Sequence, residues 1–121
     1  MSEEPSYGSD LRIKNSIDYD LASYEAFFLS LKPSTFKYNK GTSGRKHFGF
    51  IAQDVEQAMI DTGLTSDQLA ALVKDPVKEI LSDGITDYRY SIRYGELIAL
   101  NTHMIQKLYQ MVEELLQQKE G

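Results

Sequence analysis

The last part of the sequence, from Tyr94 to Leu115, carries apolar side chains that lie three and four positions apart. Side chains at this spacing share one face of an α-helix, because the helix repeats about every 3.6 residues. A seven-residue repeat of the same kind is the pattern by which helices of separate chains pack into a coiled coil. We therefore predict that the chain ends in one long amphipathic helix over residues 93–119.

Three columns of this heptad repeat are apolar. They are Asn101, Leu108 and Leu115 at a, with Asn101 the one polar member, Leu97, Met104 and Met111 at d, and Ile98, Ile105 and Val112 at e. A two-stranded coil needs only the a and d columns, so the e column calls for a further neighbour, either a third helix or the chain's own globular part. An asparagine at a typically selects register and oligomer number at a cost in stability. Periodicity leaves open an amphipathic helix packed inside a monomer.

The residues before this helix read as one small α+β unit, because the chain of 121 residues is long enough for one modest core. Apolar periodicity and turn residues give the elements. The predicted elements are a helix at 20–32, a hairpin of strands at 35–38 and 47–52, a helix at 53–62 stopped by Gly63, a short helix at 66–73, and a second hairpin of strands at 77–81 and 88–92 around a turn at 82–84.

Composition argues against several classes of function. Asp and Glu number 18 against 13 Lys and Arg, and the net charge of -5 gives no general attraction to nucleic acid or to an anionic membrane. There is no cysteine, and two histidines alone make a weak metal site. No apolar run approaches the roughly 20 residues that span a bilayer. We therefore expect no metal, no cofactor, no nucleic acid and no membrane as partners.

Three short runs stand out by their order and spacing. Residues 9–14 read SDLRIK, residues 49–55 read GFIAQDV, and residues 91–100 read SIRYGELIAL. They are similar to the Ser-Asp-x-x-x-Lys opening, the Gly-Phe-Ile-Ala-Gln-Asp-Val box and the start of the C-terminal helix in endosialidase-type intramolecular chaperones, a self-cleaving Ser-Lys peptidase family. These chaperones end phage tail-spike, tail-fibre and neck-appendage proteins. The resemblance runs from Ser9 to the end of the chain.

The resemblance implies a homotrimer with three parts per chain: an upstream linker at 1–8, a globular α+β part at 9–92, and a coiled-coil helix at 93–119 within a domain of residues 9–121. It implies a module that aligns the chains of the upstream fibre or spike for folding and then releases itself. Its place would be the host cytoplasm during virion assembly, with the parent protein on the virion tail or neck. The expected trimer interface is Leu97, Asn101, Met104, Leu108, Met111 and Leu115.

In the family the chain is cut immediately before the serine, which corresponds here to the bond between Gly8 and Ser9. Ser9 would be the nucleophile and Lys14 its base. An ordinary lysine, with a pKa of about 10.4, is almost wholly protonated at pH 7, so a base role requires burial or a neighbouring cation, for which Arg12 is a candidate. Five positions apart, the two side chains point to different sides of a helix or strand. Either the chain bends between them, or Lys14 serves Ser9 of another subunit.

Further residues are candidates for supporting roles. They are Asp10, Arg12, His47, Gly49 and Gln53. The simpler interpretation is structural for Gln53, which opens a helix, and for Gly49, which permits close backbone approach. Two alternatives to a self-cleaving chaperone remain: a trimerisation tip that is never released, and an unrelated monomeric α+β binding module. No phosphate loop, metal cluster or paired-carboxylate motif indicates an enzyme that acts on outside substrates.

Overall fold

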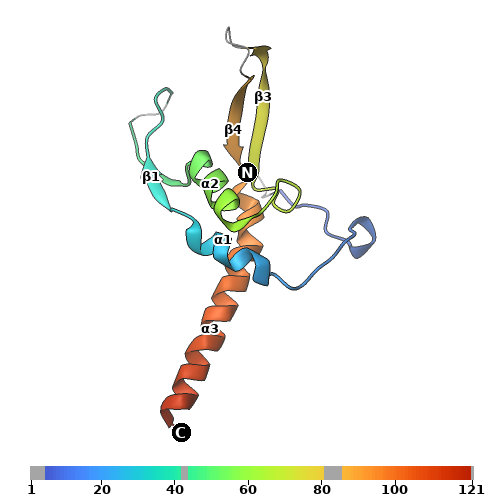
Figure 1. Ribbon diagram of the computed structural model, residues 1–121, viewed down its shortest axis with the longest axis vertical. Coiled ribbons are helices and arrows are strands. Elements are labelled where there is room, and N and C mark those ends of the chain that lie inside the picture. Colours follow the sequence, from blue (N-terminus) through green and yellow to red (C-terminus); the bar gives the residue numbers. More distant parts are fainter. Residues whose placement is uncertain (1–4, 42–43, 81–85, 121) are drawn as a thin grey trace.

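The computed structural model describes residues 5–41, 44–80 and 86–120, and it has the small α+β fold that the sequence predicts. The regular elements are α1 (Glu25–Ser30), β1 (Ser34–Phe36), β2 (His47–Gly49), α2 (Ala52–Thr62), β3 (Leu72–Ile80), β4 (Thr86–Ile92) and α3 (Ile98–Glu120), with 3₁₀ turns at Leu11–Ile13, Ala22–Tyr24 and Tyr94–Leu97. Figure 1 shows a centre formed around α1 and α2, from which α3 extends at one end and the β3–β4 hairpin at the other. The N-terminal arm leaves the centre to one side.

Two of the three predicted helices of the globular part are present. The first is shorter than expected, because a 3₁₀ turn precedes α1 and the backbone becomes extended at Leu31, ahead of Pro33. Asp20 accepts a hydrogen bond from the backbone nitrogen of Ala22 at 3.0 Å, which fixes the backbone where it enters that first turn. The second helix, α2, ends at Gly63, whose φ of 76° lies in the left-handed region that glycine tolerates best.

Two antiparallel hairpins form, each from a pair of strands that are neighbours along the chain. In the first, Thr35 of β1 lies opposite Phe48 of β2, and in the second, Lys74 of β3 lies opposite Tyr90 of β4. The predicted first hairpin is therefore confirmed with shorter strands, and the second with longer ones. The predicted turn at 82–84 lies outside the described residues.

The short helix predicted at 66–73 is wrong. Residues 66–68 form a turn, in which the Gln68 side chain accepts a hydrogen bond from the backbone nitrogen of Thr65 at 2.8 Å, and β3 begins at Leu72. Pro76, which looks like the stop after a helix, lies inside β3. A two-stranded ribbon has two open edges, so it accepts a proline that a central strand would exclude.

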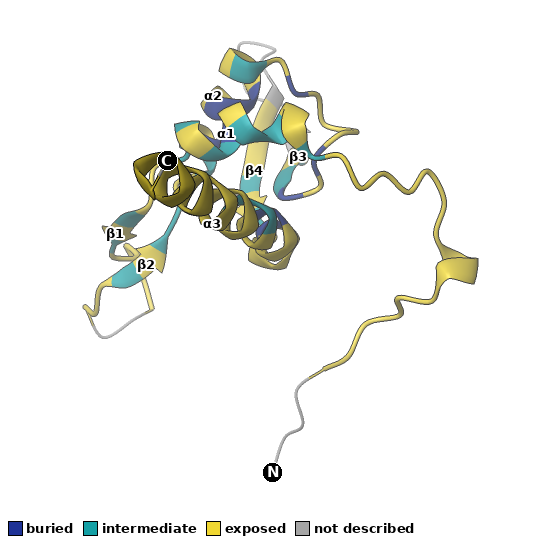
Figure 2. Cartoon of the chain, turned by 90° about the horizontal axis from the view of Figure 1, so that it is seen from below, coloured by how far each residue is buried: buried dark blue, intermediate teal, exposed yellow. Residues whose placement is uncertain are grey.

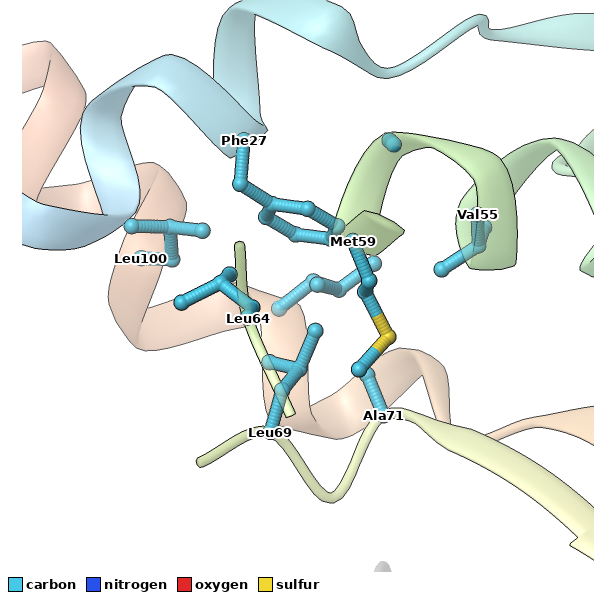
Figure 3. Packing of buried hydrophobic residues seen from close by; sticks show 9 residues of the cluster. Phe27, Val55, Met59, Leu64, Leu69, Ala71 and Leu100 are labelled. Carbon is cyan, nitrogen blue, oxygen red and sulfur yellow. The ribbon is translucent and has the colours of Figure 1, made fainter. Parts of the chain in front are cut away.

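The hydrophobic core lies where α1, α2, the start of β3 and the start of α3 meet (Figure 3). It consists of Phe27, Val55, Ala58, Met59, Leu64, Leu69, Ala71, Leu97 and Leu100. Phe27 and Ala71 are completely buried, and Leu97 and Leu100 anchor the beginning of the C-terminal helix in the same cluster. The globular part and the long helix are therefore one packed unit at this end of α3.

The rest of α3 projects from the core, and every residue from 105 to 120 is exposed (Figure 2). This stretch carries the large apolar side chains of the heptad repeat, such as Leu108 and Leu115. The long helix is thus confirmed, while its association with other copies stays a prediction. Within the described residues, no helix combines the length and the apolar character that crossing a membrane requires.

Candidate functional site

The N-terminal arm, residues 5–20, is exposed at every position, and it carries the Ser9–Lys14 pair. The Lys14 Nζ donates a hydrogen bond to the Ser9 Oγ at 2.6 Å. The backbone of this single chain therefore bends so that the two side chains meet, while a Lys14 that serves Ser9 of another subunit stays a prediction. The pair is held by no regular helix or strand but by a single 3₁₀ turn between its members.

Asp10 builds this turn. Its Oδ1 accepts a hydrogen bond from the backbone nitrogen of Arg12 at 2.8 Å, which caps the turn, and its carbonyl accepts one from Ile13 at 3.1 Å. The backbone nitrogen of Lys14 then donates to the carbonyl of Leu11 at 3.3 Å. A 3₁₀ turn has about three residues per turn, so its backbone winds more tightly than that of an α-helix. This tighter winding places the Lys14 side chain beside Ser9.

Arg12 forms a forked ion pair with Asp10. The Nε donates to Oδ1 at 3.0 Å and the terminal nitrogen to Oδ2 at 2.8 Å. The Arg12 side chain holds the pKa of Asp10 below its usual value, and Asp10 in turn raises the pKa of Arg12. The sequence offers Arg12 as a neighbouring cation that could lower the pKa of Lys14. In the structure, the charge of Arg12 is instead compensated by Asp10.

Gly8, on the upstream side of the expected cut, faces the side chain of Ile13. A Cβ placed on Gly8 would lie 3.2 Å from the Ile13 Cδ1, which is tighter than an ordinary contact. Both residues are exposed, and Ile13 keeps 68% of its surface in water. Glycine therefore leaves the backbone around the Gly8–Ser9 bond free of a crowding side chain.

His47 lies away from this pair. The β1–β2 hairpin that carries it is on the opposite side of the molecule from the N-terminal arm in both views (Figures 1 and 2). Its ring stacks on Phe36 at a centroid distance of 6.1 Å and meets the edge of Tyr38 at 5.0 Å. Its Nε2 is buried and has no hydrogen-bond partner among the described residues. Within one chain, His47 belongs to an aromatic cluster and not to the Ser9 site.

Gly49, in the run of residues 49–55, lies against Tyr94, in the run of residues 91–100. The Tyr94 hydroxyl accepts a hydrogen bond from the backbone nitrogen of Phe50 at 3.1 Å, directly beside Gly49. A Cβ on Gly49 would collide with this hydroxyl and lie 3.1 Å from the Phe36 ring. Gln53 is exposed on the first turn of α2. The structure thus brings Gly49 beside Tyr94, just before α3, and no hydrogen bond or ion pair among the described residues joins Gly49 or Gln53 to Ser9 and Lys14.

Sequence considerations missed an ionic cluster that ties α1 to α3. The His103 Nε2 lies 2.8 Å from one carboxylate oxygen of Glu25, and Lys107 donates to the other. The Lys107 hydrogen bond, followed by the one from His103, lowers the pKa of Glu25. His103 and Lys107 are four positions apart and share a helix face, but their partner is 78 positions from His103, so no local pattern predicts it.

Comparison with known proteins finds two similarities. Residues 9–64 match the family described as chaperone of endosialidase, which is named as a peptidase family. A solved structure described as the crystal structure of a novel intramolecular chaperone is 27% identical to this chain, with a TM-score of 0.67. The likeness covers 84% of this chain and 99% of that one. No curated protein gives a significant match.

Proposed function

Since this chain is an endosialidase-type intramolecular chaperone domain, we propose that it joins three copies of a phage tail-spike, tail-fibre or neck-appendage protein, aligns them for folding, and then cuts itself off before Ser9. Intertwined β-structure has few local contacts, so separate chains must meet in register before most of their stabilising pairs exist. The helix α3 forms from local contacts and can bring chains together first. The proposed setting is the host cytoplasm during assembly, with the mature protein on the virion tail or neck.

The observation that carries the proposed cut is the 2.6 Å hydrogen bond between Lys14 and Ser9. In the reaction, the Ser9 Oγ attacks the carbonyl carbon of Gly8 while its proton passes to a neutral Lys14 Nζ. The carbon–nitrogen bond between Gly8 and Ser9 breaks as an ester forms, and Lys14 returns the proton to the departing amine. Water then hydrolyses the ester, which leaves a carboxylate on Gly8 and restores the Ser9 hydroxyl.

The exposure of the pair supports a cut that waits for assembly. A lysine ammonium in open solvent keeps its proton near neutral pH, whereas the reaction needs a neutral amine. Burial against apolar surface favours that neutral form. The pair is flanked by Leu11 and Ile13, which are 71% and 68% exposed and offer such a surface to another chain. Because Ser9 and Lys14 already meet within one chain, assembly would activate them by removing water, and not by supplying the missing partner.

The same exposure favours a second candidate, a structural trimerisation tip that is never released. In that case the Ser9–Lys14 hydrogen bond is an ordinary surface contact, which contributes little to stability. The two candidates share the fold and the helix. They differ in whether the covalent mass of the chain depends on Ser9 and Lys14.

The test is the denatured intact mass of freshly expressed protein that carries native sequence upstream of residue 8. We expect the wild type to lose everything before Ser9, and Ser9→Ala and Lys14→Ala to stay whole. Ser16→Ala and Lys32→Ala are matched controls on exposed residues outside the turn, and both should cleave. If every variant stays whole and still trimeric, the peptidase assignment is withdrawn in favour of the permanent tip.

A further inference from the structure

One side of α3 is already occupied by its own chain. Leu97, just before the helix, and Leu100 are 4% and 7% exposed, and Met104 packs against the same core. His103 and Lys107 are bound to Glu25. The heptad assignment made from sequence assigns Leu97 and Met104 to the contact with other chains. In the structure these two side chains face their own globular part and have little surface left for a partner.

Exposed apolar residues of α3 form a second heptad seam beside this occupied side. The seam consists of Ile98, Ile105 and Val112 in one column and Leu108 and Leu115 in the other, with the polar Asn101 completing the second column. Met111 on one flank of the seam, and Tyr109 and Leu116 on the other, are exposed as well. The steps along the helix alternate between three and four residues, as in an a/d repeat, and no position carries a charge. In this shifted register, the column of Ile98, Ile105 and Val112 occupies position a instead of e. The column of Asn101, Leu108 and Leu115 occupies d instead of a, and the column of Leu97, Met104 and Met111 occupies g instead of d.

The new g column borders an apolar groove between α1 and α3. The groove has a volume of about 510 Å³, and its walls are the side chains of Phe28 and Leu29 from α1 and of Met104 and Met111 from α3. The Glu25–Lys107 ion pair forms its polar edge. Leu29 is 75% exposed although it lies in this apolar wall. The groove is therefore built to take an apolar group with a polar end.

We infer that the contact surface of this domain is the seam of Ile98, Asn101, Ile105, Leu108, Val112 and Leu115, and that its occupant is α3 of a second copy. This inference rests on the proposed assembly function and names its interface. A seam with its own heptad repeat matches another helix of the same repeat, and Ile105 and Leu108 belong to both seam and groove. A partner helix on the seam therefore necessarily borders the groove.

The neighbouring helix brings Tyr109 to the groove. In a parallel coil the g position of one helix faces the e position of the following heptad on the next, and in the shifted register Met104 is g and Tyr109 is e. Tyr109 is 66% exposed in its own chain. It stands about 160° around the helix from Met111, so it cannot reach its own groove. A tyrosine has the apolar ring and the polar tip that the groove suits.

The absence of tryptophan from the sequence gives this inference a clean test. Tyr109→Trp introduces a single reporter, and Glu113→Trp is the matched control on the outward face of the same helix. We expect the emission of the first variant to shift to shorter wavelength as concentration drives association, in step with the molar mass from light scattering. The emission of the control should stay unchanged. Association without a shift at position 109 overturns the inference and leaves the assembly function intact, whereas a chain that stays monomeric overturns both.

Two pairs of charge substitutions test the groove and the seam in turn. Leu29→Glu should weaken association roughly tenfold or more, while Ile60→Glu on α2, 64% exposed outside the groove, should leave it unchanged. Val112→Lys should weaken association more than Met111→Lys, because the shifted register puts Val112 at the centre of the seam and Met111 at its edge. The reverse order restores the register first assigned from sequence and overturns the shifted one. Circular dichroism of each variant checks that the fold is kept.

Discussion

The centre of the molecule and its N-terminal arm hold their shapes by different physics. In the centre, Phe27 and its neighbours are removed from water, so burial decides the geometry. In the arm, residues 5–20 are exposed throughout, and a few hydrogen bonds around Asp10 decide it. Each such bond in water contributes little, so the arm can change conformation while the centre keeps its fold. The proposed order of events, assembly first and cleavage later, would use both properties.

The largest difference in stability between the centre and the arm should come from shortening one apolar side chain in each. Phe27→Ala leaves a cavity in the core and should lower the free energy of unfolding by about 3–5 kcal/mol. Leu11→Ala in the arm should change it by less than about 0.5 kcal/mol. Both values come from denaturant unfolding at one protein concentration, because association also stabilises the folded chain. Equal losses would mean that the arm is packed on another subunit in solution.

The second contrast compares two glycines near the base of α3. Gly49→Ala places a methyl group against the Tyr94 hydroxyl and the Phe36 ring, and overpacking of this kind should destabilise the fold by about 1–3 kcal/mol. Gly95→Ala is the matched control, because a Cβ there meets no atom within 4 Å. Its effect should stay within about 0.5 kcal/mol. A stable Gly49→Ala would show that Tyr94 can leave its place without cost.

The third prediction concerns the arm alone and rests on the proposed cut. Asp10→Ala removes the cap of the 3₁₀ turn and the anchor of Arg12, so it should slow release of the upstream segment roughly tenfold while changing overall stability little. Asp10→Asn keeps an acceptor for the Arg12 backbone and should fall between wild type and Asp10→Ala. The measurement is the time course of intact mass. Unchanged cleavage in Asp10→Ala would mean that assembly, and not the turn, brings Ser9 and Lys14 together.

Sequence patterns predict the parts of this structure that depend on local physics, and fail where distant residues decide. The left-handed stop at Gly63 and the long α3 follow from nearest neighbours along the chain. For Ser9 and Lys14 the spacing leaves two arrangements open, and within the single chain the hydrogen bonds of Asp10 form the bend that lets the two side chains meet. The side of α3 that the chain itself covers depends on Leu97 and Leu100 meeting Phe27, far away in sequence. Periodicity alone therefore assigns the apolar columns but not their partners.

The smallest expected effect lies where the centre meets α3, at Glu25. Its pKa is lowered in the folded protein, mainly by Lys107 and then by His103, so its contribution to stability is fully present above the ordinary glutamate pKa of about 4.3. That contribution is lost as the pH falls through the lower folded value. Glu25→Gln should therefore flatten the decline in melting temperature between about pH 5 and pH 3. Glu113→Gln, on the exposed face of α3, should follow the wild type. A Glu25→Gln curve parallel to wild type would mean that the centre holds α3 by apolar packing alone.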